Sequence, residues 1–430
     1  MSILRYALTA LSVLTLATAS TTATAAAAPF AEGAHIDRVV INPGGDAATT
    51  MAVTFRGLGE NGAVEVDAPY ADARIESATA VLRHGQPPAE LDPFSGTGEH
   101  FSAVLGGLRP VTIRRVRPVV DGRPGEWAEF STASAEADPF SFLYFGDAQN
   151  SLTEVWPKVT AHALEHSPDA ALTIHPGDQI DLPYVDQEWA DFFSGLHGSM
   201  ATRPSIVAAG NHELMLDPLL REHRAHFEFP YNGHPDFPET TFYNDYQGVR
   251  FITLHANYMA LDQQAAWLDT ALNENPHQWS VVVFHQPIWN VTERRADPVH
   301  NHAFRETLER HDVDLVLTGH DHSYGRGHSV ERDTGTPGRH DGPVSVSAVS
   351  GGKSYSVNTE GDPWREFGGV RARTAGGLST FQRVEVDGCR LDFRAIVGHA
   401  SDKATLPLVE GDVLDEFAID KCGEGKLVTY

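Results

Sequence analysis

The sequence VDLVLTGHDH, residues 313–322, decides how the chain folds and where its chemistry lies. It begins as an apolar, β-branched run of strand length, breaks at Gly319, and continues at once into His320 and His322. Open α/β sheets build their sites at the carboxyl ends of strands, so both imidazoles are expected to leave one strand end side by side. By itself His-x-His is more typical of surface histidines, and its meaning depends on the other strand ends.

Four other expected strands also end in polar clusters. In chain order these are FGDAQ (145–149), HPGDQID (175–181), AGNHE (209–213) and FHQP (284–287). Each cluster alone has an ordinary explanation, because Gly-Asp is commonly a turn and Asn-His-Glu commonly caps a helix. Five such clusters, in order and at strand ends, favour one shared site.

The donor atoms of these clusters are carboxylate, amide and imidazole groups, without thiolates. Such donors suit iron, zinc or manganese. A carboxylate can bridge two cations, and two cations can hold the attacking and leaving oxygens of a displacement at phosphorus. The clusters therefore predict a two-metal hydrolytic site.

Two regions of different character are expected in the mature chain. Residues 35–132 contain short alternating runs separated by Gly, Pro and Asp, which is typical of a β-sandwich. Residues 133–138 consist of Ala, Ser, Glu and Asp and are interpreted as a linker. From 139 to 422 strands and helices alternate, which predicts a layered α/β domain, and the strand-rich tail is expected to complete a second sheet.

The first 28 residues have the composition of a secretory signal peptide. Arg5 precedes an apolar run at 6–17, and small residues follow to Ala28. A membrane anchor is the alternative, but this run is shorter than a membrane span. We expect a secreted or periplasmic protein, in which Cys389 and Cys422 either form a disulfide or remain buried free thiols.

The charge balance argues against polyanionic partners, namely nucleic acid and anionic membranes. The chain has 58 acidic and 32 basic residues and a formal net charge of −26. Nucleic-acid and anionic-membrane binding need clustered Lys and Arg, so neither is expected. An anionic substrate would need bound cations to supply the local positive field.

The five clusters resemble those of the calcineurin-like metallophosphoesterase superfamily. With the β-rich segment in front, the chain resembles over residues 35–420 its purple acid phosphatase branch, in which residues 35–132 would be an N-terminal fibronectin type III-like domain. The resemblance implies a four-layer α/β/β/α sandwich and two metal ions per chain. The metal ligands that it implies are Asp147, Gln149, Asp178, Asn211, His285, His320 and His322.

The resemblance also implies a role for each residue. Asp178 would bridge the metals, with Asp147 and His322 on the first metal. Asn211, His285 and His320 would bind the second metal. His212 would be the general acid, or the hydrogen-bond donor to the leaving group, with Glu213 as its partner.

Two residues depart from the purple acid phosphatase pattern. Gln149 stands two residues after Asp147, where the purple enzymes have Gly and many other metallophosphoesterases have His, and it offers either an amide ligand or a hydrogen bond around the site. Asp181 stands in the place of the tyrosine that colours those enzymes, so a colourless protein is expected. His300 and His302 are expected to contact substrate, with an exposed loop as the alternative. Arg294 and Arg295 are further candidates for phosphate contact.

The expected function is that of an exported, acid-phosphatase-like phosphomonoesterase that hydrolyses a small phosphate ester with a hydroxide activated by two metals. Two alternatives stay open. The same ligands serve a phosphodiesterase or nucleotidase, because the pocket walls decide that choice. A secreted binding module with a decayed site is the other alternative.

Overall fold

The computed structural model describes residues 30–31, 33–67, 76–84, 98–293, 295, 297–357 and 363–430. The expected signal peptide, residues 1–28, lies outside this description. Within the described part of the chain, no helix is both long and apolar enough to cross a bilayer.

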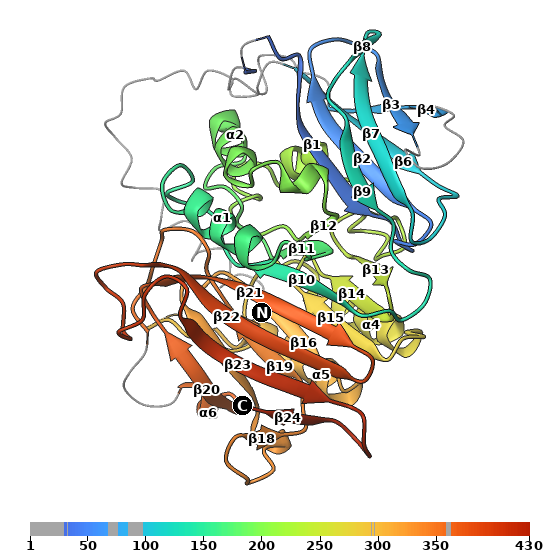
Figure 1. Cartoon of the computed structure of the whole chain (residues 1–430). Helices are drawn as coiled ribbons and strands as arrows, with labels where there is room; N and C mark the ends of the chain where they lie inside the picture. The colour runs from blue at the N-terminus through green and yellow to red at the C-terminus, as the bar shows by residue number, and fades with distance from the viewer. Residues whose placement is uncertain are drawn as a thin grey trace, which may run out of the picture.

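The described residues between 36 and 131 form two antiparallel sheets around one apolar core (Figure 1). The first sheet has the order β1 (Ile36–Pro43), β2 (Met51–Gly57), β6 (Glu99–Leu105), β5 (Val81–His84). The second has the order β4 (Glu76–Thr79), β3 (Gly62–Asp67), β7 (Ile113–Val120), β8 (Arg123–Pro124), and β9 (Ala128–Ser131) also pairs with β7. Phe55 and Phe101 from the first sheet meet Val64 and Val116 from the second. The all-β prediction is confirmed for these residues.

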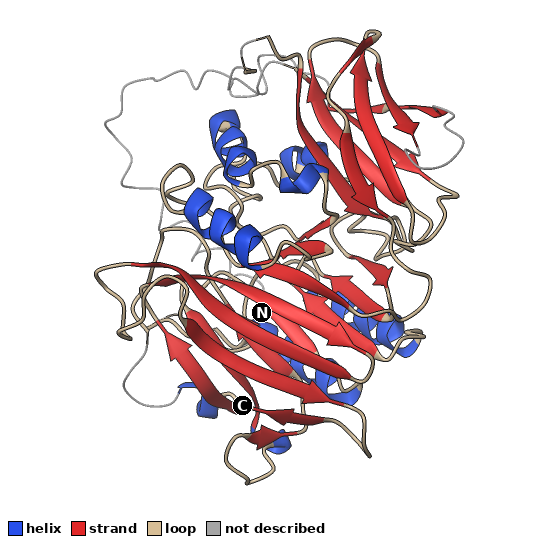
Figure 2. Cartoon of the chain, viewed as in Figure 1, coloured by secondary structure: helices blue, strands red, loops and turns tan. Residues whose placement is uncertain are grey.

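Two larger sheets follow in the rest of the chain (Figure 2). The eight-stranded sheet has the order β12 (Ser205–Val207), β11 (Leu172–His175), β10 (Phe140–Phe145), β21 (Leu378–Asp387), β22 (Arg390–Ala400), β23 (Val413–Asp420), β24 (Leu427–Thr429), β18 (Arg339–His340). The seven-stranded sheet has the order β13 (Phe242–Tyr246), β14 (Val249–Thr253), β15 (Trp279–Val283), β16 (Leu315–Thr318), β19 (Val344–Ser347), β17 (Tyr324–Ser329), β20 (Gly369–Ala375). Strands β10 to β12 are parallel, and so are β14, β15, β16 and β19.

The helices described are short and lie between the strands in sequence. They are α1 (Trp156–His166), α2 (Asp186–Gly195), α3 (Arg221–His226), α4 (Leu261–Asn273), α5 (Val299–Arg310) and α6 (Pro363–Glu366). Helices α4 and α5 pack against each other, and α1 packs on β21 and β22.

Alternating side chains explain why strands such as β15 and β16 are apolar throughout. Val281 and Leu315 belong to the core that the two large sheets share. Val282 and Val316, their neighbours in sequence, face Leu268 of α4 and other apolar residues of α4 and α5. A strand that is covered on both faces needs apolar residues at every position.

The strand-rich tail does not form a sheet of its own. Strand β19 pairs with β16, whereas β21 pairs with β10 and continues into β22 and β23. The tail therefore completes both large sheets. The eight-stranded sheet also continues past residue 422, because β24 pairs with β23.

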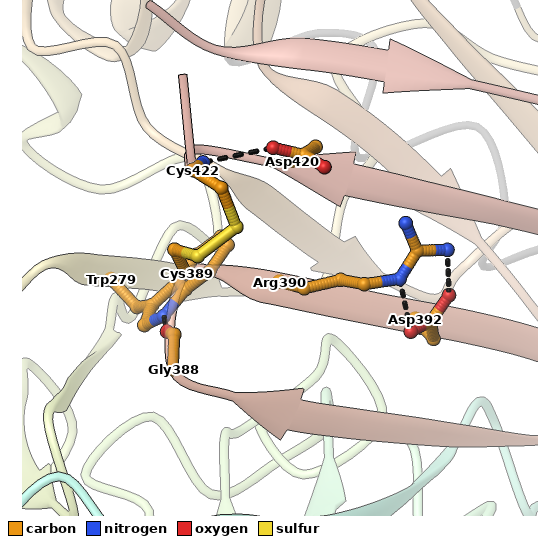
Figure 3. The surroundings of a disulfide bond; sticks show 7 residues. All are labelled: Trp279, Gly388, Cys389, Arg390, Asp392, Asp420 and Cys422. Carbon is orange, nitrogen blue, oxygen red and sulfur yellow. Dashed lines mark hydrogen bonds and ion pairs between the residues drawn. A yellow bond between two sulfur atoms is a disulfide. The ribbon is translucent and has the colours of Figure 1, made fainter.

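Cys389 and Cys422 form a disulfide, with their Cα atoms 5.0 Å apart (Figure 3). The bridge joins the start of β22 to the end of β23, beside the hydrogen bond of 2.9 Å from Trp279 Nε1 to the carbonyl of Gly388. It closes a loop of 33 residues. Such a loop corresponds to about 3–4 kcal/mol of stabilisation in the chain-entropy account.

Two buried histidines stack between the large sheets. The rings of His328 on β17 and His340 on β18 lie 3.7 Å apart, and both side chains are buried. Among the described residues, neither ring nitrogen of His328 has a hydrogen-bond partner. Burial lowers the pKa of His328 to about 4, and burial together with the charges of His328, Arg326 and Lys426 lowers the pKa of His340 to about 2.

Acid is therefore expected to destabilise the fold. Each folded-state pKa lies below the unfolded value, so the unfolded chain binds more protons, and the stability present at pH 7 is lost as the pH falls below about 6.5. Between pH 7 and pH 4.5 each histidine should remove about 2 kcal/mol from the free energy of unfolding. Urea denaturation over this range measures the loss. The double variant His328→Phe, His340→Phe should show a shallower pH dependence, and an equal slope would contradict this explanation.

Candidate metal centre

The five polar clusters meet where the two large sheets face each other. Asp147, Asp178 and Asn211 follow β10, β11 and β12 of the eight-stranded sheet, and His285 and the 320–322 pair follow β15 and β16 of the seven-stranded sheet. The structure brings their donor atoms together in two groups. One contains Asp178, His285 and His320, and the other contains Asp147, Asp178 and His322. Within each group the ligand atoms lie within 4.8 Å of one another, and Asp178 is common to both.

Unusual backbone conformations aim these side chains. Asp178, His320 and His322 have φ values of 54°, 70° and 48°, in the left-handed region that residues other than glycine rarely adopt. Such conformations persist where the surrounding structure holds them. Close packing adds to this constraint, because a Cβ on Gly319 would lie 1.9 Å from Oδ1 of Asp147 and one on Gly210 would lie 2.1 Å from Oδ1 of Asp178.

The first group surrounds Asp147. His322 Nε2 lies 3.2 Å from Asp147 Oδ2, and the Gln149 amide nitrogen donates to Asp178 Oδ2 over 2.7 Å. The amide oxygen of Gln149 is buried and has no hydrogen-bond partner among the described residues. Because amide oxygen and nitrogen are assigned from their surroundings, either atom can face the cluster.

The second group surrounds His285, whose Nε2 faces three other donors. It lies 3.1 Å from Asp178 Oδ2, 3.1 Å from Asn211 Oδ1 and 3.2 Å from His320 Nδ1. Burial opposes ionisation of Asp178, but the charge and hydrogen bond of His285 hold the pKa of Asp178 below its ordinary value.

The cluster has the electrostatics of a cation site. Burial, with a contribution from the charge of Asp178, raises the pKa of Asp147 to about 8 and that of Glu213 to about 7. Buried carboxylates of this kind need a positive charge close by to remain ionised. Oxygen and imidazole donors in two groups that share one carboxylate therefore fit a pair of divalent or trivalent cations.

His212 lies at the edge of the cluster, with 17% of its side chain exposed. Its Nδ1 lies 2.7 Å from the carbonyl oxygen of Asp181 and must donate to it, because a carbonyl oxygen only accepts. This contact occupies Nδ1 and leaves Nε2 for other partners. Nε2 lies 3.9 Å from Asp178 Oδ2, so it faces the metal centre.

Glu213 has a role that the sequence did not reveal. Instead of holding the ring of His212, its carboxylate accepts backbone N–H groups from Asp178, Gln179 and Gly210, over 2.9, 2.8 and 2.7 Å. It thereby joins the strand ends that carry Asp178 and Asn211. The feature of the sequence that could have indicated this role is the position of Glu213 directly after Asn211 and His212 at a strand end.

Asp321, between the two histidines, also has a structural role. Its buried carboxylate accepts hydrogen bonds from Asn290 Nδ2 over 3.1 Å and from the backbone N–H of Thr292 over 3.2 Å. The contacts of Asp321 therefore fix the loop after β15, while His320 and His322 face the centre.

The expected substrate residues His300 and His302 do not belong to the two ligand groups. His300 is buried in α5, with Nε2 2.5 Å from the carbonyl oxygen of Ala256, and His302 is exposed on the same helix. Substrate contact by these two stays a prediction. Arg294 lies outside the described residues, whereas Arg295 Nη1 donates to the carbonyl oxygen of His320 over 3.1 Å.

Comparison with known proteins shows what this chain is similar to. The calcineurin-like phosphoesterase family profile matches residues 140–324, which include all five clusters. Purple acid phosphatase 18 of Arabidopsis thaliana is 27% identical over 309 residues, which cover 64% of this chain and 66% of that protein. Probable purple acid phosphatase 20 of the same plant is 27% identical over 283 residues, covering 61% and 63%. The chain thus spans slightly less than two thirds of the length of these relatives.

Two solved structures share the fold. The purple acid phosphatase PPD1 from yellow lupin seeds has a TM-score of 0.73 at 14% identity, covering 90% of this chain and 74% of that one. The structure of PhoD has a TM-score of 0.63 at 12% identity, covering 93% of both chains. The chain therefore contains a calcineurin-like phosphoesterase domain with purple acid phosphatase relatives, in a mixed α/β fold. These findings support a phosphoric ester hydrolase and imply a binuclear metal centre.

Proposed function

We propose that the protein is an exported phosphomonoesterase of the purple acid phosphatase type that hydrolyses small phosphate esters. One observation carries the proposal: a single buried carboxylate, Asp178, belongs to two groups of metal-type donors at once. A shared carboxylate between two cations is the arrangement that in-line displacement at phosphorus uses. The family match and the plant relatives support the same reaction.

Each side chain of the cluster has a task in this proposal. Asp147, His322 and the amide oxygen of Gln149 would hold the first ion, and Asp178 would be shared. Asn211, His285 and His320 would hold the second ion. When bound, iron, zinc or manganese ions would supply the charge that activates a water nucleophile and neutralises the phosphoryl oxygens.

His212 is assigned the proton transfer to the leaving group. The hydrogen bond from its Nδ1 to Asp181 fixes the ring, so that Nε2 points toward the cluster. An imidazole so placed can donate to a leaving oxygen near neutral pH. Asp181 stands where the purple enzymes have a tyrosine, and we propose that this protein is colourless.

The proposal includes the organisation of the chain. Residues 1–28 would be a signal peptide, 35–132 a fibronectin type III-like domain, and 139–422 the core of a four-layer catalytic domain that runs on through β24. The first domain would also support the second, because buried Arg56 of β2 pairs with Asp186 of α2 over 2.8 Å, and Asn42 of β1 donates to the carbonyl oxygen of Ser205.

Elemental analysis combined with kinetics tests the function. The purified mature protein should contain about two metal ions per chain. It should hydrolyse 4-nitrophenyl phosphate, lose this activity on chelation, and regain it with zinc, iron or manganese. Turnover of bis(4-nitrophenyl) phosphate at an equal rate would favour a diesterase. Protein that is folded, metal-free and inactive after metal addition would contradict the proposal.

A further inference from the structure

Two cationic side chains lie beside the metal centre on one aromatic ring. The guanidinium carbon of Arg295 lies 5.1 Å from the ring centroid of Tyr355, and Lys353 Nζ lies 5.6 Å from the same centroid. The ring of Tyr355 also contacts the ring of His322, with centroids 4.9 Å apart. The centre therefore has a cationic wall on the side of the His-x-His pair.

Backbone contacts fix this wall relative to the centre. The backbone N–H of Tyr355 donates to the carbonyl oxygen of His322 over 3.3 Å. Ser323 Oγ donates to the carbonyl oxygen of Tyr355 over 3.0 Å. The segment that carries Lys353 and Tyr355 is thus tied to the loop that carries the two histidines, so the fold sets the position of Tyr355 beside them.

Neither cation has a carboxylate partner within ion-pair distance among the described residues. Other cations of this acidic chain do have one, as Arg383 pairs with Asp169 at 2.7 Å and Lys426 pairs with Asp312 at 2.6 Å. With 58 acidic residues against 32 basic ones, two cations left without carboxylates on one ring indicate a place for an external anion.

The chemistry of His320 frees Arg295 for that anion. In this structure Arg295 Nη2 lies 2.6 Å from His320 Nε2, so Nε2 accepts, while His320 Nδ1 faces the ligand group. A neutral imidazole has one lone pair on its ring nitrogens. If Nδ1 held a cation, Nε2 would carry the proton and would no longer accept from Arg295. Nη2 of the guanidinium would then need another acceptor, while Nη1 keeps the carbonyl oxygen of His320.

We propose that Arg295, Lys353 and Tyr355 form a second anion subsite, which binds a negative group on the leaving group of the substrate. The preferred substrates are phosphate esters whose leaving group itself carries a carboxylate or a second phosphate. This inference rests on the proposed phosphatase function, and it narrows the class of small phosphate esters on which that function acts.

Two matched pairs of esters test the subsite. The first compares 3-phosphoglycerate with glycerol 3-phosphate, which lacks the carboxylate, and the second compares fructose 1,6-bisphosphate with fructose 6-phosphate. In each pair the ratio of kcat/KM values is measured. We expect the more anionic ester to be favoured about tenfold or more in at least one pair, which corresponds to about 1.4 kcal/mol per tenfold. The pair that shows the preference identifies the anion, carboxylate or phosphate.

Variants assign the preference to the proposed residues. Lys353→Gln should lower the ratio severalfold while leaving it above one, and the double variant with Arg295→Gln should bring it close to one. Lys158→Gln, an exposed lysine on α1, is the matched control and should keep the wild-type ratio. Metal content is measured for each variant, because a ratio that falls only together with the bound metal would mean damage to the centre and would overturn the subsite.

Two negative results are distinguishable. If the protein hydrolyses 4-nitrophenyl phosphate but favours neither anionic ester, the subsite is wrong and the proposed function stands. If it hydrolyses no ester in the presence of its metals, the proposed function fails, and the subsite fails with it. A preference that Lys353→Gln and the double variant leave unchanged places the anion elsewhere.

Discussion

Asp178→Asn is expected to lower the turnover of 4-nitrophenyl phosphate by roughly a thousandfold, since it removes the carboxylate that would hold two cations, whose positive charge would be worth several kcal/mol in the transition state. Asp178 is the residue that both ligand groups share. An amide bears no charge and bridges two cations poorly, so the metal content should fall below two per chain as well. Elemental analysis of the variant gives this second measurement independently of activity.

The substitution is mild for the fold, which makes the result interpretable. Position 178 has a φ of 54°, and Asn tolerates the left-handed region better than most residues. Its amide oxygen can still accept the backbone N–H of His212, as Oδ1 of Asp178 does over 2.9 Å. Asp169→Asn, at an exposed carboxylate paired with Arg383, is the control and should keep metal and activity. Full activity of Asp178→Asn would exclude the shared-carboxylate site.

Glu213→Gln is expected to have the second-largest effect, on stability and activity together. The Glu213 carboxylate accepts three backbone N–H groups in a buried position. A glutamine offers one oxygen and turns an NH₂ group toward the remaining N–H, which leaves a buried donor unsatisfied. This should lower the free energy of unfolding by about 1–3 kcal/mol. Because the strand ends of Asp178 and Asn211 lose their connection, turnover should fall about 10- to 100-fold.

Urea denaturation and kinetics on the same preparation separate these two effects. Glu165→Gln, at an exposed position of α1, provides the matched control and should change neither quantity. Loss of stability with wild-type kcat would show that Glu213 braces the fold without positioning the ligands. An unchanged free energy of unfolding would contradict the hydrogen-bond role itself.

The sequence predicted the parts of this fold that repeat a simple pattern. The strands β10, β11, β12, β14, β15 and β16 follow from apolar runs that end in polar clusters, and α4 follows from helical spacing. The short strands β13, β17 and β20 were missed, because they carry polar and glycine residues and are held by pairing with their neighbours. Pairing between distant segments leaves no periodic signal in the sequence.

The candidate site, like the fold, was predicted from the sequence only in part. The ligand candidates could be named because each stands at a recognisable strand end. Lys353 and Tyr355 could not, although they follow β19, whose end lies beside that of β16. That strand end carries Ser-Gly-Gly in place of acidic or imidazole residues, and only the spatial neighbourhood of Val349 and Asp147 reveals that it belongs to the same edge. Glu213 and Asp321 accept hydrogen bonds from backbone N–H groups of other segments, and the sequence does not show which segments those are.

The glycines at the strand ends restrict which parts of this chain can be substituted. At Gly210 and Gly319 even one added methyl group would meet a ligand carboxylate, so the backbone around the centre admits no gradual variation. The wall residues Arg295, Lys353 and Tyr355 meet the centre through side chains, which can be exchanged without moving the backbone. Substrate choice can therefore diverge, in evolution or in the laboratory, while the catalytic machinery stays the same.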